Sequence, residues 1–159
     1  MIFVTFGTFH CEFQRPLRII EKAVIDGKVN EEIIVQSGHT TFTSPYLKIT
    51  PFFTPEELSR FYDEARVIVS HAGIGSVLMG VRKGKKLIVT ARLKKFNEHV
   101  DDHQLDILEA YAGLHHILPW YENESFENML EKIKDFTPAP YVSNKEKLID
   151  FLIDYIDKI

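Results

Sequence analysis

The sequence has little that would point to secretion, to a membrane or to nucleic acid. Its 159 residues contain one cysteine, Cys11, so no internal disulfide can form, which fits a reducing cytoplasm. No apolar run approaches the roughly 18 to 20 residues that a membrane-spanning helix needs. The amino terminus lacks a basic leader, so we expect no signal peptide. The net charge of −4 argues against general binding of nucleic acid, and we expect a cytoplasmic protein.

Apolar patterns of two kinds alternate along the chain and predict an α/β fold. Short β-branched runs indicate strands, and runs with helical spacing separate them. This alternation is typical of a Rossmann-like parallel sheet with helices on both faces. We expect strands at residues 2–6, 32–36, 46–50, 67–69, 87–90 and 115–118, and helices at 17–25, 54–64, 76–83, 100–112, 125–134 and 144–159.

A proline-rich segment at residues 137–140 separates the last predicted helix from the rest. We expect a domain over residues 1–136, followed by a hinge and a C-terminal helix over 137–159. That helix carries an apolar stripe, formed by Leu148, Phe151, Leu152, Tyr155, Ile156 and Ile159. Two interpretations stay open: the stripe packs on the domain's own sheet, or it docks a partner subunit.

Positive charge is concentrated between residues 81 and 97, which hold seven cations and no acid. One interpretation is a solvated surface. The other is a face turned toward diphosphates or anionic lipid headgroups. The cations are Arg82, Lys83, Lys85, Lys86, Arg92, Lys94 and Lys95.

Residues 70–76, with the sequence SHAGIGS, follow a predicted strand and open a predicted helix. Gly73 and Gly75 let a ligand approach the backbone closely, and Ser76 can bond an oxygen of that ligand. The first amides of a helix have no partner within the helix, and they face the positive end of its dipole. Ligands of open α/β sheets bind at this edge. The loop therefore predicts a phosphate or diphosphate site, although an ordinary strand-to-helix turn has the same sequence features.

Three segments together resemble the carboxyl-terminal domain of family 28 glycosyltransferases. They are the 70–76 loop, the strand entry GKKLIV at 84–89, and NEHVDDHQ at 97–104; the opening FVTFGT at 3–8 agrees with them. Within this family the chain looks most similar to the soluble donor-binding subunits of two-component bacterial exopolysaccharide glycosyltransferases. It is also similar to the soluble subunit of the eukaryotic dolichol-pathway N-acetylglucosaminyltransferase.

The resemblance implies the carboxyl-terminal half of a GT-B glycosyltransferase. This half holds a UDP-sugar, and a membrane-anchored acceptor-binding subunit supplies the lipid-linked acceptor. We then expect transfer of a hexose in exopolysaccharide or capsule synthesis, at the inner face of the plasma membrane through the partner. The alternative is a non-catalytic nucleotide-sugar-binding module that enhances a partner transferase. We expect no metal ion or other cofactor.

The resemblance also assigns roles along the predicted sheet edge. The diphosphate would contact Gly7, Thr8, His71, Gly73, Gly75 and Ser76. The base that activates the acceptor hydroxyl would lie on the partner, or would be Glu98 or His10. Many relatives hold the ribose with a glutamate at the position of Met79, and a thioether cannot make that bond.

The densest polar cluster runs from Glu98 to Gln104, and three interpretations of it stay open. His99 and His103 are four residues apart, so they would share a helix face. The cluster could be an exposed helix start, or a zinc site built on the two histidines and an acid. The interpretation that the resemblance favours is contact with the donor sugar, with His103 and Gln104 reaching the hexose and Glu98 a hydroxyl or the ribose.

Overall fold

Six short parallel strands form one sheet at the centre of the molecule. The computed structural model describes residues 1–158, and the sheet has the order β3-β2-β1-β4-β5-β6. The residues of β1, β4 and β5 are all buried, as expected for a parallel sheet covered on both faces. The strands are β1 (Ile2–Thr5), β2 (Ile33–Gln36), β3 (Lys48–Thr50), β4 (Val67–His71), β5 (Leu87–Thr90) and β6 (Leu118–Pro119).

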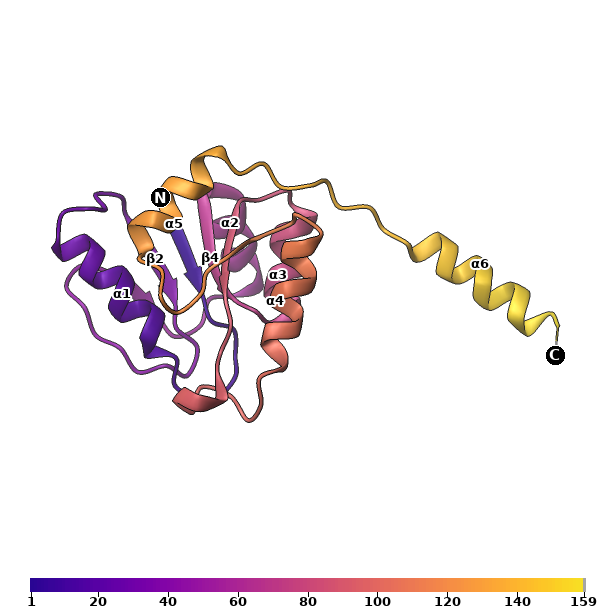
Figure 1. The fold of residues 1–159 in the computed structure, drawn as a ribbon, viewed down its shortest axis with the longest axis horizontal. Helices are drawn as coiled ribbons and strands as arrows, with labels where there is room; N and C mark the ends of the chain where they lie inside the picture. The colour runs from indigo at the N-terminus through magenta and orange to yellow at the C-terminus, as the bar shows by residue number, and fades with distance from the viewer. Residues whose placement is uncertain (159) are drawn as a thin grey trace.

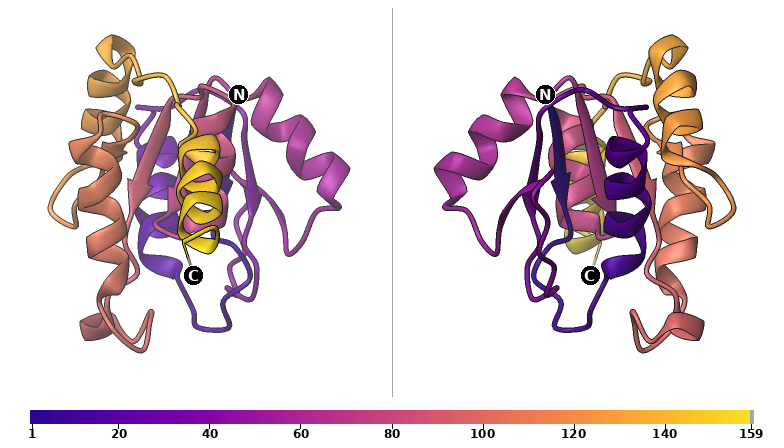
Figure 2. Two further views of the ribbon diagram at one scale, coloured as in Figure 1. Left: turned by 90° about the vertical axis from the view of Figure 1, so that its right-hand side faces the viewer. Right: turned by 90° about the vertical axis from the view of Figure 1, so that its left-hand side faces the viewer.

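Helices cover both faces of the sheet, which confirms the predicted architecture (Figure 2). Residues of α1 and α5 pack on one face, and residues of α2, α3 and α4 pack on the other. Successive residues of a strand point to opposite faces, so Ile2 and Val4 join the first core and Phe3 the second. The helices are α1 (Gln14–Ile25), α2 (Pro55–Glu64), α3 (Ile74–Arg82), α4 (His103–Gly113), α5 (Phe126–Asp135) and α6 (Lys145–Ile156).

Local signals mark helix starts accurately where a side chain caps the helix. Thr54 accepts a hydrogen bond from Glu57 N, and the Glu57 carboxylate accepts one from Thr54 N. This reciprocal pair begins α2, as predicted. The helix predicted from residue 100 begins only at His103, because residues 97–102 form turns held by a bond from Glu98 N to Leu93 O.

The C-terminal helix stands away from the body of the protein (Figure 1). The segment before it does touch the body, since Ala139 N donates to His115 O at 2.8 Å. None of residues 145–158 is buried, so the interpretation that the stripe packs on the domain's own sheet is wrong. Ile159, the last predicted member of that stripe, lies outside the described residues. Among residues 1–158, no helix has the length and apolar character to cross a bilayer.

Candidate functional site

The strand order reverses direction between β1 and β4, and the predicted donor site lies at this point. The chain builds β1, β2 and β3 outward on one side, then returns to place β4, β5 and β6 on the other. Thr5 and Ser70 are register partners, so residues 7–12 and 72–76 leave the sheet side by side. Loops that diverge in this way leave a crevice at the carboxyl edge, where open α/β sheets bind their ligands.

The N-terminus of α3 offers free backbone amides at this edge. Gly73 is the N-cap residue, and the helix has no side-chain cap hydrogen bond within residues 1–158. Gly75 is exposed, and a Cβ built on it meets nothing within 4 Å. The Tyr62 hydroxyl donates to Ser76 O at 3.0 Å and so fixes the first turn of α3 against α2. The predicted group of Gly73, Gly75 and Ser76 is therefore placed as an anion site requires.

His71 lies between two glycines, one from each loop. A Cβ on Gly7 would stand 2.6 Å from His71 Cε1, and a Cβ on Gly73 would stand 2.1 Å from His71 Nε2. Gly7 also has a φ of +66°, a conformation that L side chains rarely adopt. Both positions therefore require glycine, and the imidazole joins the β1 loop to the β4 loop.

The environment of His71 keeps its imidazole neutral. Burial, with a smaller contribution from the nearby Arg92 cation, lowers the pKa of His71 to about 4. Its Nδ1 atom is buried, with no hydrogen-bond partner among residues 1–158. A neutral imidazole at the predicted diphosphate position would offer one N–H donor without a full charge.

Arg92 is a buried cation that ties three segments together. Its side chain is 1% exposed, and its guanidinium donates to the carbonyl oxygens of Phe6 at 3.2 Å, Cys11 at 2.7 Å and Glu98 at 3.3 Å. The guanidinium also lies 4.6 Å from the centre of the Phe13 ring. Burial lowers the pKa of Arg92 to about 10, so the side chain remains charged at neutral pH. Arg92 therefore positions the β1 loop against the β5 loop.

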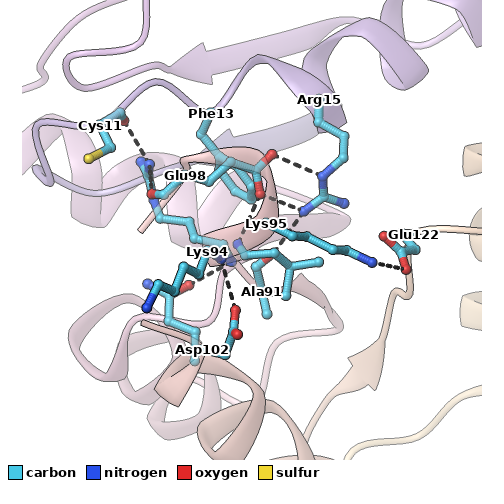
Figure 3. A network of polar contacts seen from close by, with 12 residues as sticks. Cys11, Phe13, Arg15, Ala91, Lys94, Lys95, Glu98, Asp102 and Glu122 are labelled. Carbon is cyan, nitrogen blue, oxygen red and sulfur yellow. Dashed lines mark hydrogen bonds and ion pairs between the residues drawn. The ribbon is translucent and has the colours of Figure 1, made fainter. Parts of the chain in front are cut away.

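Glu98 has a structural role that the sequence did not predict. Its carboxylate accepts two bonds from the Arg15 guanidinium, each 2.9 Å, and a third from Leu93 N at 3.0 Å (Figure 3). The residue is only 4% exposed. With three donors already bound, the carboxylate oxygens are not free to meet a hydroxyl of the acceptor or of the sugar. We therefore no longer assign Glu98 as the base or as a sugar contact.

Gln104 and His103 begin α4, beside the crevice. The Gln104 side chain is buried, and its Oε1 accepts from Arg92 N at 3.0 Å, which leaves its amide N–H₂ as the group that can meet a ligand. His103 is exposed. His99 precedes the helix, so the expected shared helix face is wrong, yet the two imidazoles still meet at 4.7 Å because the turn at Asp101 folds them together.

The loop after β1 carries the remaining predicted residues. Thr8 and His10 are exposed, and Gly7 is half-buried. The ring of Phe9 lies 4.6 Å from that of His10 and 4.4 Å from that of His99, with which it stacks. Phe9 thus connects this loop to the 97–104 cluster.

The basic run does not form a single face. Lys85 and Lys86 precede β5 and lie at the amino edge of the sheet, whereas Lys94 and Lys95 follow β5 at the carboxyl edge. Lys86 Nζ donates to the carbonyl oxygens of Ile133 and Lys134, and Lys95 Nζ pairs with Glu122 at 2.6 Å. The expectation of one surface turned toward diphosphates or lipid headgroups is therefore wrong.

Two residues near the site were not explained by the sequence: the burial of Arg92 was not predicted, and the role of Met79 was left open. Arg92 looked like one more surface cation, and only its place directly after the buried strand β5 hinted at its burial. Met79, which the resemblance placed at a ribose-binding position, is half-buried and packs against the second core. Its side chain serves packing in this protein.

Comparison with known proteins gives a match over nearly the whole chain. The model of the family described as "Glycosyltransferase family 28 C-terminal domain" matches residues 2–158. Among curated proteins, the UDP-N-acetylglucosamine transferase subunit ALG13 of Yarrowia lipolytica is 35% identical over 72 residues, which are 45% of this chain and 35% of that protein. The ALG13 subunit of Candida albicans is 27% identical over 100 residues, covering 62% of this chain and 33% of that protein. The chain thus spans about a third of the length of these relatives.

Solved structures agree with this match at the level of the fold. The glycosyltransferase SnogD from Streptomyces nogalater superposes with a TM-score of 0.61 at 18% identity, over 84% of this chain and 34% of that one. MurG of Acinetobacter baumannii superposes with a TM-score of 0.55 at 18% identity, over 82% of this chain and 39% of that one. A solution structure of ALG13 superposes with a TM-score of 0.55 at 19% identity, over 91% of each chain. The sheet and its helices thus match the carboxyl-terminal half of GT-B glycosyltransferases.

Proposed function

Because the chain belongs to the glycosyltransferase family 28 C-terminal domain family, we propose that it is the donor-binding subunit of a UDP-sugar-dependent glycosyltransferase. The observation that carries this proposal is the N-terminus of α3. Its amides have no side-chain cap, and its exposed Gly75 stands at the point where the strand order reverses. The curated relatives are named as UDP-N-acetylglucosamine transferase subunits, so UDP-N-acetylglucosamine is the donor we propose.

In the proposed reaction an acceptor hydroxyl attacks the anomeric carbon of the donor sugar. The bond from that carbon to the diphosphate breaks, and negative charge grows on the departing UDP. Amides of Gly75 and Ser76, together with Thr8 and His71, would stabilise that charge without a metal ion. The hydroxyl proton goes to a base, and with Glu98 engaged by Arg15, His10 is the candidate base on this chain.

The donor sugar would be read by the start of α4. The Gln104 amide N–H₂ would donate to a hexose hydroxyl, and the Arg92 N–H bond to Oε1 would hold the amide in place. His103 is exposed beside it and would contact the same sugar. Rigid support of this kind favours specificity, because the donor need not order the side chain on binding.

We further propose that α6 docks a membrane-anchored acceptor-binding subunit. The apolar side chains of α6 are exposed, with Phe151 at 64%, and an apolar stripe of this size indicates an interaction surface. The partner would bring the chain to its lipid-linked acceptor. Exopolysaccharide or capsule synthesis at the inner face of the plasma membrane stays a prediction of the resemblance.

The proposal is tested by binding and turnover measured on the same preparation of the full chain. Calorimetry with UDP-N-acetylglucosamine, UDP and GDP should show binding of the two uridine nucleotides in preference to GDP. Turnover should then require membranes that contain the partner and a lipid-linked acceptor. Absence of uridine-nucleotide binding would contradict the donor site. If the partner subunit transfers the sugar without this chain, and the chain binds UDP but only enhances that activity, the chain is the non-catalytic module instead.

A further inference from the structure

Three side chains between β5 and α4 bring metal-ligating atoms together at one point. His99, Asp101 and His103 each offer one ligand atom, and these atoms all lie within 4.8 Å of one another. Asp101 Oδ1 is 3.0 Å from His99 Nδ1 and makes a shorter contact with His103 Nδ1. One carboxylate oxygen therefore faces two imidazole nitrogens.

The protein holds this group in place through contacts outside it. The His99 ring stacks on Phe9, with ring centres 4.4 Å apart and an angle of 19° between the planes, and its side chain is 8% exposed. Asp101 Oδ1 also accepts from His103 N at 3.2 Å. Two of the three ligands are thus oriented by packing or by the backbone, so little side-chain freedom remains to be lost when an ion binds.

We propose that His99 Nδ1, Asp101 Oδ1 and His103 Nδ1 form a binding site for a late first-row divalent cation such as Zn²⁺. Imidazole and carboxylate together are a common ligand set for such ions. The ion binds each imidazole in the tautomer that carries its hydrogen on Nε2, so both Nδ1 lone pairs and the carboxylate oxygen are available to the ion without loss of a proton. Asp101 and His103 are half exposed, so water completes the coordination.

This site shares the His103 ring with the proposed donor site but uses a different atom of that ring. It uses Nδ1 of His103 and leaves Nε2 of that ring for a sugar contact, and it does not include Gln104 or the α3 amides. Its test requires neither nucleotide nor turnover, so its failure would not affect the proposed function. Likewise, absence of UDP binding would not contradict the proposed metal site.

The test is titration of the untagged, chelator-treated full chain with ZnCl₂ in a calorimeter, repeated with CoCl₂ in a visible spectrometer. The wild-type chain should bind one equivalent of each ion. Loss of a single outer-shell partner already costs about 10- to 100-fold in metal affinity, so loss of a ligand should cost at least about 100-fold. Asp101→Asn and His103→Ala should each show this loss, and the cobalt absorption should decrease with it.

Two variants make the result specific. Asp101→Asn keeps a carbonyl oxygen that accepts from both rings, so it preserves the hydrogen bonds and removes only the charge. His39→Ala removes another exposed histidine far from the cluster in the sequence, and it should bind zinc like the wild type. A wild-type chain without a one-to-one site would overturn the proposal. So would a site that survives both cluster substitutions, or one that His39→Ala abolishes.

Discussion

Arg15 and Glu98 stand 83 positions apart in the chain, and the folded protein pairs them through two parallel hydrogen bonds of 2.9 Å each. Arg15 also donates to Ala91 O at 2.8 Å. The pair therefore fastens the start of α1 to the loop after β5. Both segments border the proposed donor crevice, so we expect this contact to hold them at a fixed separation.

Breaking that pair should destabilise the fold. Arg15→Met leaves the buried Glu98 carboxylate without its cation, and removal of one member of a buried pair costs about 3 kcal/mol or more. Urea unfolding should show this loss. Lys22→Met, which removes an exposed partner of Asp26, is the matched control and should change little. Equal effects of the two substitutions would show that the Arg15 pair adds nothing beyond a surface contact.

Gly75→Asp should weaken UDP binding by about tenfold or more, which corresponds to about 1.4 kcal/mol. The new carboxylate would occupy the open space at the α3 N-terminus and repel the diphosphate. The site is exposed, so the fold should persist. Gly113→Asp adds the same charge at another open helical glycine and should bind UDP normally. Calorimetry of both variants distinguishes a local effect from a change in net charge, and unchanged binding by Gly75→Asp would place the diphosphate elsewhere.

Gln104→Ala should separate recognition of the sugar from recognition of the nucleotide. Loss of one hydrogen bond to a neutral hydroxyl is worth about 0.5–1.5 kcal/mol, so the affinity for UDP-N-acetylglucosamine should fall by that amount while UDP affinity stays nearly unchanged. The variant should also unfold more easily, because Arg92 N loses its acceptor. An equal loss for both ligands would place Gln104 on the nucleotide.

The buried His71 should make the protein less stable as the pH falls from about 6.5 to about 4. An unfolded histidine has its ordinary pKa of 6.5, whereas the folded value is about 4. Above pH 6.5 both states are neutral, so His71 contributes no pH dependence there. Between the two values the unfolded state binds the extra proton, and unfolding becomes more favourable by about 3 kcal/mol in total.

Unfolding of wild type and His71→Asn at several pH values measures this effect. The wild type should lose more stability than the variant across that window, since all other groups are shared. A nuclear magnetic resonance titration should show the His71 ring still neutral at pH 5. A ring that titrates near 6.5, or identical pH dependence of the two proteins, would contradict the prediction.

Phe151→Ser with Tyr155→Ser should leave the free energy of unfolding almost unchanged, within about 0.5 kcal/mol, because exposed side chains without packing contacts stabilise little. UDP binding should also be unchanged. In cells that express the membrane partner, the double variant should move from the membrane fraction to the supernatant. Asp150→Ser with Asp154→Ser alters the opposite side of α6 and should remain with the membranes. A double variant that stays membrane-bound would show that docking uses another surface.

Local chemistry in the sequence determined the elements and the class of the fold. The capping pair Thr54 and Glu57 marked the start of α2, and the β-branched runs at Val67 and Leu87 marked buried strands. These signals act between neighbours in the chain, so they can be read without the tertiary structure. The strand–glycine turn–helix order likewise placed Gly73 and Gly75 at the sheet edge where the structure has them.

Only the tertiary structure determined the burial and the partners of the charged and apolar side chains. From the sequence, the Glu98 carboxylate was expected to be available as a base, but in the fold Arg15 binds it from a distant part of the chain. Arg92 was expected to be an exposed cation, but the loops after β1 and β5 cover it. The stripe of α6 resembled a core-packing face, yet no described residue of that helix is buried. A periodic pattern reports that an apolar face exists, but the surface that covers it depends on segments far away in the sequence. The energy of a charge likewise depends on burial and on partners that only the folded chain brings together.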